Sequence, residues 1–181
     1  MKQHRIVELL GDGISSELSS SVHAVADSLP FGVTFEEVDV SLEARRANRD
    51  DVYGKAETSL RDVRTALKYP TVTEQESPNK VLRELFEFSV IHRPVQTFPG
   101  VENNFKQNLD IDVVRVATGG TYTDRGMRIG NESAVSLRVI ERGPSRFAAR
   151  FAFRLANEKS ASVVSTSKWT IQRAADGLFE D

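Results

Sequence analysis

Residues 5–29 read RIVELLGDGISSELSSSVHAVADSL and contain an apolar strand, a glycine turn and an amphipathic helix in direct succession. Residues 5–10 form the short apolar strand, and Gly11-Asp12-Gly13 interrupts it. Apolar residues then recur at helical spacing until Pro30 ends the pattern. These residues are Ile14, Leu18, Val22, Val25 and Leu29. A strand that leads through a glycine turn into a helix is typical of an α/β protein.

The same alternation of strands and helices continues toward residue 98. Strands are expected at residues 33–40, 69–73 and 88–93, and helices at residues 56–67 and 79–86. Strands separated by helices favour a largely parallel sheet. The sequence changes character after Pro99-Gly100, which we take as a boundary between a domain over residues 1–98 and a second over residues 99–181.

The second domain is expected to hold three strands and two helices. The strands cover residues 110–117, 135–139 and 161–165, and the second helix covers residues 169–177. Val135, Leu137 and Val139 alternate with polar residues, which predicts a strand with one solvated face. The first, longer helix begins near Pro144, because proline is favoured in the first turn of a helix.

The composition excludes several classes of protein. The 181 residues include 24 Lys and Arg against 26 Asp and Glu, a formal net charge of −2, which indicates no nucleic-acid or membrane surface. The absence of cysteine excludes disulfides and thiolate sites and fits a reducing compartment. No apolar run reaches the ~18 residues of a membrane helix, and no signal-peptide core follows Met1. We therefore expect a soluble, cytoplasmic protein.

Several polar residues, taken singly, favour structural roles. Gly11-Asp12-Gly13 is typical either of a phosphate cradle at a helix start or, more commonly, of a tight turn. The three histidines lack the spacing of a metal site, and no residue of this chain is assigned to a metal. Arginine and aspartate side chains outside the motifs are expected to face solvent. They are Arg45, Arg46, Arg49, Asp110 and Asp112.

Three arginines, Arg83, Arg93 and Arg115, stand at or beside the ends of predicted elements. Guanidinium groups pair bidentately with carboxylates, so this set predicts a pocket for a polyanion. Tyr122 follows a Gly-Gly turn, and Lys168 lies between a predicted strand and helix, where α/β enzymes place working groups. These features alone indicate an anion-binding α/β enzyme.

Short motifs along almost the whole chain strengthen this interpretation. They are Gly11-Asp12-Gly13-Ile14 with Glu17, Lys68-Tyr69-Pro70 with Thr73, Ser77-Pro78-Asn79 with Arg83 and His92-Arg93-Pro94, the stretch from Arg115 to Tyr122, and Ser167-Lys168 with Asp176-Gly177-Leu178-Phe179. In this order and spacing the chain resembles the isocitrate and isopropylmalate dehydrogenases. The resemblance implies an α/β fold over the family's N-terminal half, with part of the large domain and the start of the small, dimerisation-side domain.

The resemblance also implies a substrate site. Arg83, Arg93 and Arg115 would hold the α- and β-carboxylates of a 2-hydroxy acid, and Ser77 and Asn79 the γ-carboxylate of isocitrate. The implied activity is NAD(P)-dependent oxidative decarboxylation of isocitrate, or a closely related 2-hydroxy acid, to a 2-oxo acid. This chain would supply the substrate-binding half of that enzyme.

Catalytic and cofactor roles follow from the same resemblance. Tyr122 would protonate the enol left after carbon dioxide departs, and Lys168 would remove the hydroxyl proton of a partner subunit's substrate. Lys68 and Thr73 would lie along the nicotinamide of NAD or NADP. The ligands of Mg²⁺ or Mn²⁺ are expected from the family's C-terminal half, which these residues do not match. A homodimer, or completion by another chain, is expected.

Departures from the motifs support an alternative. The family's Glu-Asn-Thr-Glu is replaced by Val116-Ala117-Thr118-Gly119, and Ser167 and Thr170 stand where the family has histidine and asparagine. These changes favour a non-catalytic homologue or regulatory subunit that binds a tricarboxylate or a partner chain. The choices between NAD and NADP, and among isocitrate, homoisocitrate and tartrate, stay open.

Overall fold

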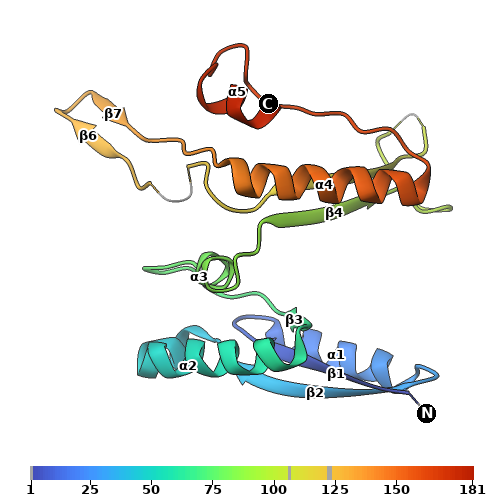
Figure 1. Cartoon of the computed structure of the whole chain (residues 1–181). Coiled ribbons are helices and arrows are strands. Elements are labelled where there is room, and N and C mark those ends of the chain that lie inside the picture. The colour runs from blue at the N-terminus through green and yellow to red at the C-terminus, as the bar shows by residue number, and fades with distance from the viewer. Residues whose placement is uncertain (1, 106, 122–123) are drawn as a thin grey trace. The chain divides into compact units, whose positions relative to one another are not determined.

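A computed structural model describes residues 2–105, 107–121 and 124–181 (Figure 1). Two compact units are present, Met1–Leu85 and Phe86–Asp181. The predicted domain boundary after residue 98 falls inside the second unit, and the assignment of residues 1–98 and 99–181 to the family's two domains stays a prediction. No helix in the described residues is long and apolar enough to cross a bilayer.

The first unit is built on a parallel sheet of three strands. β1 (Gln3–Leu10) is central, β2 (Gly32–Asp39) pairs with it along its whole length, and β3 (Ala66–Lys68) pairs with its second half. Helix α1 (Ser15–Asp27) connects β1 to β2, and α2 (Leu42–Val63) connects β2 to β3. This βαβ arrangement is the one that the sequence pattern predicts.

Local signals explain where α2 lies. Ser41 caps its start, with the hydroxyl accepting a hydrogen bond from the Ala44 amide at 3.3 Å. Arg64 ends it in the left-handed conformation, with φ of 63°. The predicted helix over 56–67 is therefore wrong in its bounds. A strand over 69–73 is also wrong, because β3 ends at Lys68 and residues 69–73 are irregular.

Helix α3 (Pro78–Leu85) closes the first unit and lies close to the predicted residues 79–86. Pro78 occupies its first position, where a missing amide hydrogen costs nothing. The Ser77 carbonyl accepts hydrogen bonds from the Lys80 and Val81 amides at 2.9 and 3.1 Å. Ser77 therefore stands at the point where the loop enters the helix.

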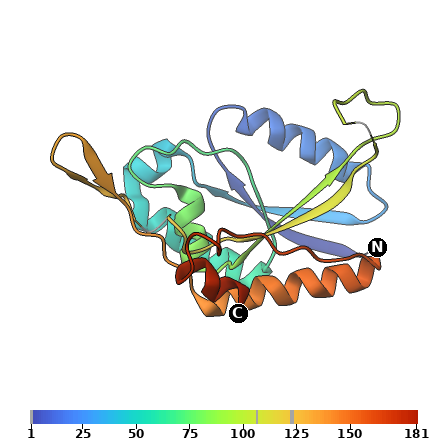
Figure 2. The same cartoon turned by 90° about the horizontal axis from the view of Figure 1, so that it is seen from above.

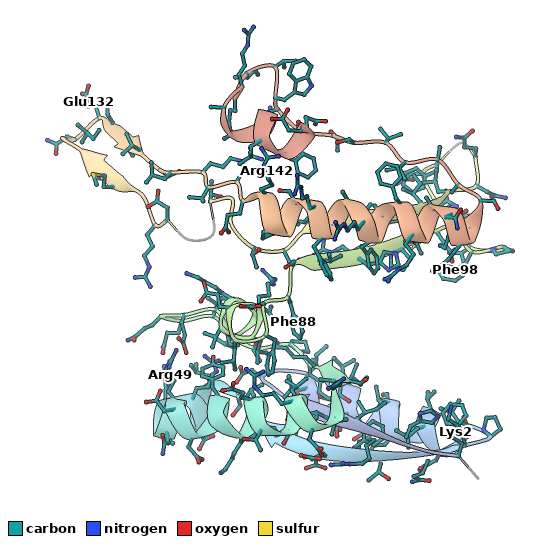
Figure 3. The ribbon with its side chains drawn as sticks, in the orientation of Figure 1. Lys2, Arg49, Phe88, Phe98, Glu132 and Arg142 are labelled. Carbon is teal, nitrogen blue, oxygen red and sulfur yellow. The ribbon has the colours of Figure 1, made fainter. Side chains whose placement is uncertain are left out.

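The second unit contains two antiparallel ribbons. β4 (Val90–Gln96) pairs with β5 (Asp110–Val116), and β6 (Met127–Ile129) pairs with β7 (Ser133–Val135). Helix α4 (Arg142–Lys159) packs along the β4–β5 ribbon, and α5 (Ala175–Glu180) packs against α4. Figures 1 and 2 show the β6–β7 hairpin extending away from α4, with Glu132 labelled at its tip in Figure 3.

Three sequence predictions for this unit are corrected. β4 continues through Pro94, which lies opposite Asp112 on a strand with a single described neighbour, an edge position that tolerates proline. Residues 161–165 form no strand, because no described strand pairs with them. The predicted strand over 135–139 begins earlier and ends at Val135, while the predicted helix over 169–177 is displaced to α5.

The two faces of the β4–β5 ribbon have different surroundings. On one face, the His92 ring lies 5.6 Å from the Phe151 ring of α4, and Asp112 forms an ion pair with Lys159 at the end of the same helix. On the other face, the side chains of Ile111 and Val113 are exposed. In an antiparallel pair, alternate residues share a face, so the covered and exposed sets follow directly from the register.

Candidate functional site

The glycine turn after β1 lies directly against the loop after β3. A Cβ atom on Gly11 would come within 2.0 Å of the Pro70 carbonyl oxygen, so no larger residue fits there. The Asp12 amide donates a hydrogen bond to the same carbonyl at 2.7 Å. The opening motif and the Lys68-Tyr69-Pro70 motif are therefore packed backbone to backbone.

The Asp12 carboxylate joins three segments of the first unit. Oδ1 accepts a hydrogen bond from the Leu42 amide at 2.8 Å, and Oδ2 accepts one from the Val72 amide at 2.7 Å. The Arg45 guanidinium lies 3.7 Å from Oδ2. These contacts support the tight-turn interpretation of Gly11-Asp12-Gly13 rather than a phosphate cradle, since the acidic side chain is used in holding protein backbone.

Arg45 is buried, so the prediction that it faces solvent is wrong. Its Nε donates to the Val40 carbonyl at 3.0 Å and its Nη2 to the Val72 carbonyl at 2.8 Å. The side chain thereby satisfies backbone groups that burial would otherwise leave unpaired. The sequence does not reveal the burial of Arg45, because nothing in the pair Arg45-Arg46 indicates which arginine is buried and which is solvated.

Arg46 and Arg49 are exposed as predicted, but they also hold the loop after β3. Arg46 forms an ion pair with Glu74, and Arg49 forms one with Glu76 at 2.8 Å. Figure 3 labels Arg49 on α2. Hydrogen bonding to Arg49 lowers the pKa of Glu76, against the opposing effect of burial. Helix α2 therefore fixes the segment that carries Thr73 and leads to Ser77.

The two residues predicted to contact the cofactor lie in or beside this loop. Lys68 is half-buried, and its Nζ donates to the Tyr69 carbonyl and to the Thr71 hydroxyl, both at 2.9 Å. Burial lowers the pKa of Lys68, and the nearby Arg45 cation lowers it further, whereas Asp12 opposes the shift. Thr73 is exposed. Their contact with a nicotinamide stays a prediction.

Three predicted substrate-binding residues lie on α3 or directly before it. Ser77 is half-buried before the helix, and Asn79 is exposed in its first turn. Arg83 follows four residues later, so it shares a helix face with Asn79. This end of the first unit thus presents an amide and a guanidinium together, a combination suited to a carboxylate.

The other two arginines come together in the second unit. In the register of β4 and β5, Arg93 lies opposite Val113 and Arg115 lies opposite Ile91. Both arginines are therefore on the ribbon face that α4 leaves uncovered, as diagonal neighbours within reach of long side chains. Two cations on one face repel each other, so an anion between them is favourable. The union of this pair with Arg83 in one pocket stays a prediction.

The two predicted catalytic residues have different outcomes. Tyr122 lies outside the described residues. Lys168 has an exposed side chain, and its backbone amide donates a hydrogen bond to Asp176 Oδ2 at 2.7 Å. Asp176 lines a cavity of about 460 Å³ together with Arg115 and Arg138. Sequence reasoning did not assign Asp176 or Arg138 a role, although Asp176 belongs to a matched motif.

The acidic and imidazole groups of the described residues do not form a metal site. Residues 2–105, 107–121 and 124–181 hold no group of three potential metal ligands among histidine, aspartate and glutamate. The prediction that Asp112 is solvated is wrong, because Lys159 and His92 bind its carboxylate and lower its pKa. His23 binds Glu8, and His4 packs against Phe31. The described residues by themselves therefore do not fit a divalent cation.

Comparisons with known proteins agree with the motifs and the fold. A family model described as isocitrate/isopropylmalate dehydrogenase matches residues 5–181. Subunit 1 of mitochondrial NAD isocitrate dehydrogenase from Ajellomyces capsulatus is 31% identical, over 98% of this chain and 47% of that protein. Subunit gamma 1 of the mitochondrial NAD enzyme from Rattus norvegicus is 32% identical, over 98% of this chain and 46% of that protein. The chain spans about half the length of the curated relatives that it matches.

Solved structures show the same fold. Isocitrate dehydrogenase from Methylococcus capsulatus superposes with a TM-score of 0.83 at 24% identity, over 98% of this chain and 55% of that one. The TT0538 protein from Thermus thermophilus gives a TM-score of 0.82 at 29% identity, over 97% and 37% of the two chains.

The fold and the motif order thus define an α/β chain built like the N-terminal half of a dehydrogenase. The chain belongs to the isocitrate/isopropylmalate dehydrogenase family. The predicted family and the predicted fold of its N-terminal half are both confirmed.

Proposed function

We propose that this chain supplies the substrate-binding half of an NAD(P)-dependent dehydrogenase that oxidatively decarboxylates isocitrate or a closely related 2-hydroxy acid. The observation that carries the proposal is the arginine pair on the uncovered face of the β4–β5 ribbon. Arg93 and Arg115 lie within the residues that the family model matches, and they share that face through the strand register. Relatives of about twice this length are named as isocitrate dehydrogenase subunits.

The proposed roles of the residues follow from their chemistry. Arg83, Arg93 and Arg115 bind the α- and β-carboxylates of the hydroxy acid, and Ser77 and Asn79 bind the γ-carboxylate of isocitrate. Polar groups facing a γ-carboxylate favour isocitrate over isopropylmalate, because an isopropyl group would leave them unpaired at a cost of about 1–3 kcal/mol.

Proton transfers complete the proposed reaction. Lys168 accepts the hydroxyl proton as hydride leaves the substrate carbon, and Tyr122 returns a proton to carbon after decarboxylation. Bound NAD or NADP would accept the hydride. The relatives are named as NAD enzymes, which favours NAD here. A Mg²⁺ or Mn²⁺ ion would need ligands from outside the described residues.

The whole enzyme is proposed to be a homodimer or to be completed by another chain, with a cytoplasmic location. Completion is supported by the share of the relatives that this chain covers and by their names as subunits. The names of the relatives place those proteins in mitochondria. The cytoplasmic proposal rests on the absence of cysteine in this sequence, which fits a reducing compartment.

A second candidate function is a non-catalytic homologue that binds a tricarboxylate or a partner chain. The altered segment after Arg115 favours it. Ala117 is buried where the family motif has a polar residue, and the Thr118 hydroxyl is buried without a hydrogen bond in the described structure. These positions therefore offer no acidic or amide group to a substrate.

The test combines turnover with binding. The chain is completed by the C-terminal half of a family member, and reduction of NAD and NADP with isocitrate and Mg²⁺ is followed by absorbance. We expect turnover in the wild type and a fall in kcat/KM of about 10- to 100-fold for Arg93→Ala or Arg115→Ala, because each loses charge-assisted hydrogen bonds. Arg150→Ala, at an exposed position on α4, should leave kcat/KM unchanged.

The outcomes separate the two functions. Binding of isocitrate in calorimetric titration without reduction of either nucleotide would favour the non-catalytic homologue. Turnover of isopropylmalate with a kcat/KM equal to that of isocitrate would contradict the proposed substrate.

A further inference from the structure

The turn that carries Lys168 is held by a buried carboxylate of the following helix. Asp176 is 1% exposed, and its Oδ2 accepts the hydrogen bond from the Lys168 amide at 2.7 Å. The Lys168 carbonyl in turn accepts hydrogen bonds from the Ile171 and Gln172 amides at 2.9 and 2.8 Å. Both backbone groups of Lys168 are therefore fixed, while its side chain stays exposed.

A single cation compensates the buried charge of Asp176 in the described part of the chain. Arg138 Nη2 lies 3.2 Å from Asp176 Oδ1, and Arg138 Nη1 donates to the Gln172 side chain at 3.4 Å. A buried carboxylate is costly unless it is paired and hydrogen-bonded. The ion pair with Arg138 offsets part of the cost of burying Asp176, and Arg138 also contacts Gln172 of the turn that carries Lys168.

A second carboxylate of α5 holds the chain just before Lys168. Glu180 accepts hydrogen bonds from the Ser165 hydroxyl at 3.2 Å and the Ser167 hydroxyl at 2.5 Å. The Ser167 hydroxyl also accepts one from the Trp169 amide at 3.3 Å. Helix α5 therefore holds this segment through two carboxylates. Glu180 binds the serine hydroxyls before Lys168, and the buried Asp176 binds the Lys168 amide itself.

We propose that Asp176, balanced by Arg138, is the positioning residue for Lys168. The catalytic part of this inference rests on the proposed function, in which the Lys168 amine accepts the substrate's hydroxyl proton. Asp176 acts by fixing the main chain from which the lysine extends, because its buried carboxylate accepts the hydrogen bond of the Lys168 amide. A shift of about 1 Å in a reacting group can cost about 100-fold in rate, so loss of this anchor lowers kcat.

The experiment compares Asp176→Ala, Asp176→Asn and Asp181→Asn. Alanine removes both the acceptor and the charge, whereas asparagine keeps an acceptor for the Lys168 amide in nearly the same shape. Asp181→Asn is the matched control, because Asp181 follows the same helix and is exposed. Amide exchange over residues 165–172 is measured in the full chain. Values of kcat and KM for isocitrate are measured in the completed enzyme.

We expect Asp176→Ala to accelerate exchange over residues 165–172 and to lower kcat by about 100-fold with KM nearly unchanged. Asp176→Asn should keep most of the exchange protection and most of the kcat, and the Asp181→Asn control should change neither quantity. If Asp176→Asn folds but leaves exchange unprotected, or if Asp176→Ala leaves exchange unchanged, the anchor is overturned.

Other outcomes separate this inference from the proposed function. Faster exchange with unchanged kcat in an active enzyme would overturn the positioning role while leaving the proposed activity intact. A wild-type enzyme that does not oxidise isocitrate would overturn the proposed activity, and the exchange of the Lys168 segment would still decide the anchor.

Discussion

The two units differ in how much apolar surface they bury. Buried apolar side chains of the described residues lie almost entirely in the first unit, where Val7 and Leu9 of β1 form the centre. The second unit contributes Ala117 and Ala148. A parallel sheet with helices as crossovers buries its own strands, whereas a two-stranded ribbon with one helix has a second face left over.

The leftover face explains why so many large apolar side chains of the second unit are exposed. They include Val95, Ile111 and Val113 on the β4–β5 ribbon, and Met127 and Ile129 on the β6–β7 hairpin. Covering one such side chain contributes roughly 1.5–3 kcal/mol. We therefore expect the second unit to need a further part of the enzyme or a partner chain, and the first unit to depend on its own core.

The largest expected effect contrasts one residue from each unit. Leu9→Ala should destabilise the first unit by about 2–5 kcal/mol, because Leu9 is buried in the sheet. Ile111→Ala should change the stability of the isolated chain by no more than about 0.5 kcal/mol, because Ile111 is already exposed. Urea unfolding, followed by amide exchange in β1 and by Trp169 fluorescence in the second unit, measures both. Equal effects would break the contrast.

A smaller effect concerns the buried carboxylate of the first unit. Burial raises the pKa of Glu8, but hydrogen bonds from Tyr69, His23 and Ser19 outweigh it, so the pKa lies below its usual 4.5. Burial and the bond to Glu8 raise the pKa of Tyr69 to about 12, so the phenol remains a donor. As the pH falls, the Glu8 carboxyl of the unfolded state therefore takes up a proton before that of the folded state. The stabilisation by these hydrogen bonds is present above pH 4.5, and it is lost as the pH falls through the lower pKa of the folded state.

Replacement of Glu8 by glutamine should remove that pH dependence. We expect the wild type to be more stable by about 1–3 kcal/mol near neutral pH, with the difference shrinking under acid conditions. Urea unfolding of both proteins from about pH 7 to about pH 3 measures it. Parallel stability curves for the two proteins would show that Glu8 does not titrate as inferred.

The smallest effect concerns the ion pair between α2 and the loop after β3. Arg49 and Glu76 are partly solvated, so a double-mutant cycle with Arg49→Ala and Glu76→Ala should give a coupling of about 0.2–1 kcal/mol. The coupling should vanish near ~1 M salt, because screening weakens solvated pairs. Lys55 and Asp51, an exposed pair within α2, provide the control. A coupling energy that persists at high salt would contradict the description of Arg49 and Glu76 as a solvated ion pair.

The sequence predicts the first unit better than the second for a physical reason. In β1, Val7 and Leu9 are buried in the core, so the strand can be read directly from the sequence. The helical spacing of apolar residues predicts α1, although Ile14 and Val25 are exposed. The segment 161–165 has strand composition but no described neighbour to pair with, and pairing is a tertiary property. The last helix begins at Ala175, and Asp176 in its first turn accepts a hydrogen bond from the Lys168 amide, a contact that composition does not reveal.

Residues of the candidate site that belong to motifs could be predicted from the sequence. Residues whose place depends on packing could not. Motif order identified Arg93 and Arg115, and the strand register then showed that they share a face. The burial of Arg45 and the anchoring role of Asp176 depend on contacts that are distant in sequence or hidden inside a turn. The sequence does not distinguish a buried charged residue from a solvated one. Only the contacts in the folded structure show which residues are buried.

The hydrogen bonds that Asp12 accepts also bear on the order in which the first unit folds. Their donors, the amides of Leu42 and Val72, lie 30 and 60 residues further along the chain. Chain loops of these lengths must close before either bond can form, and the lost entropy is recovered only afterwards. A φ-value near zero is therefore expected for Asp12→Ala, with unfolding accelerated and folding hardly changed. The glycine turn, although local in sequence, is locked in place only after the sheet and α2 have assembled.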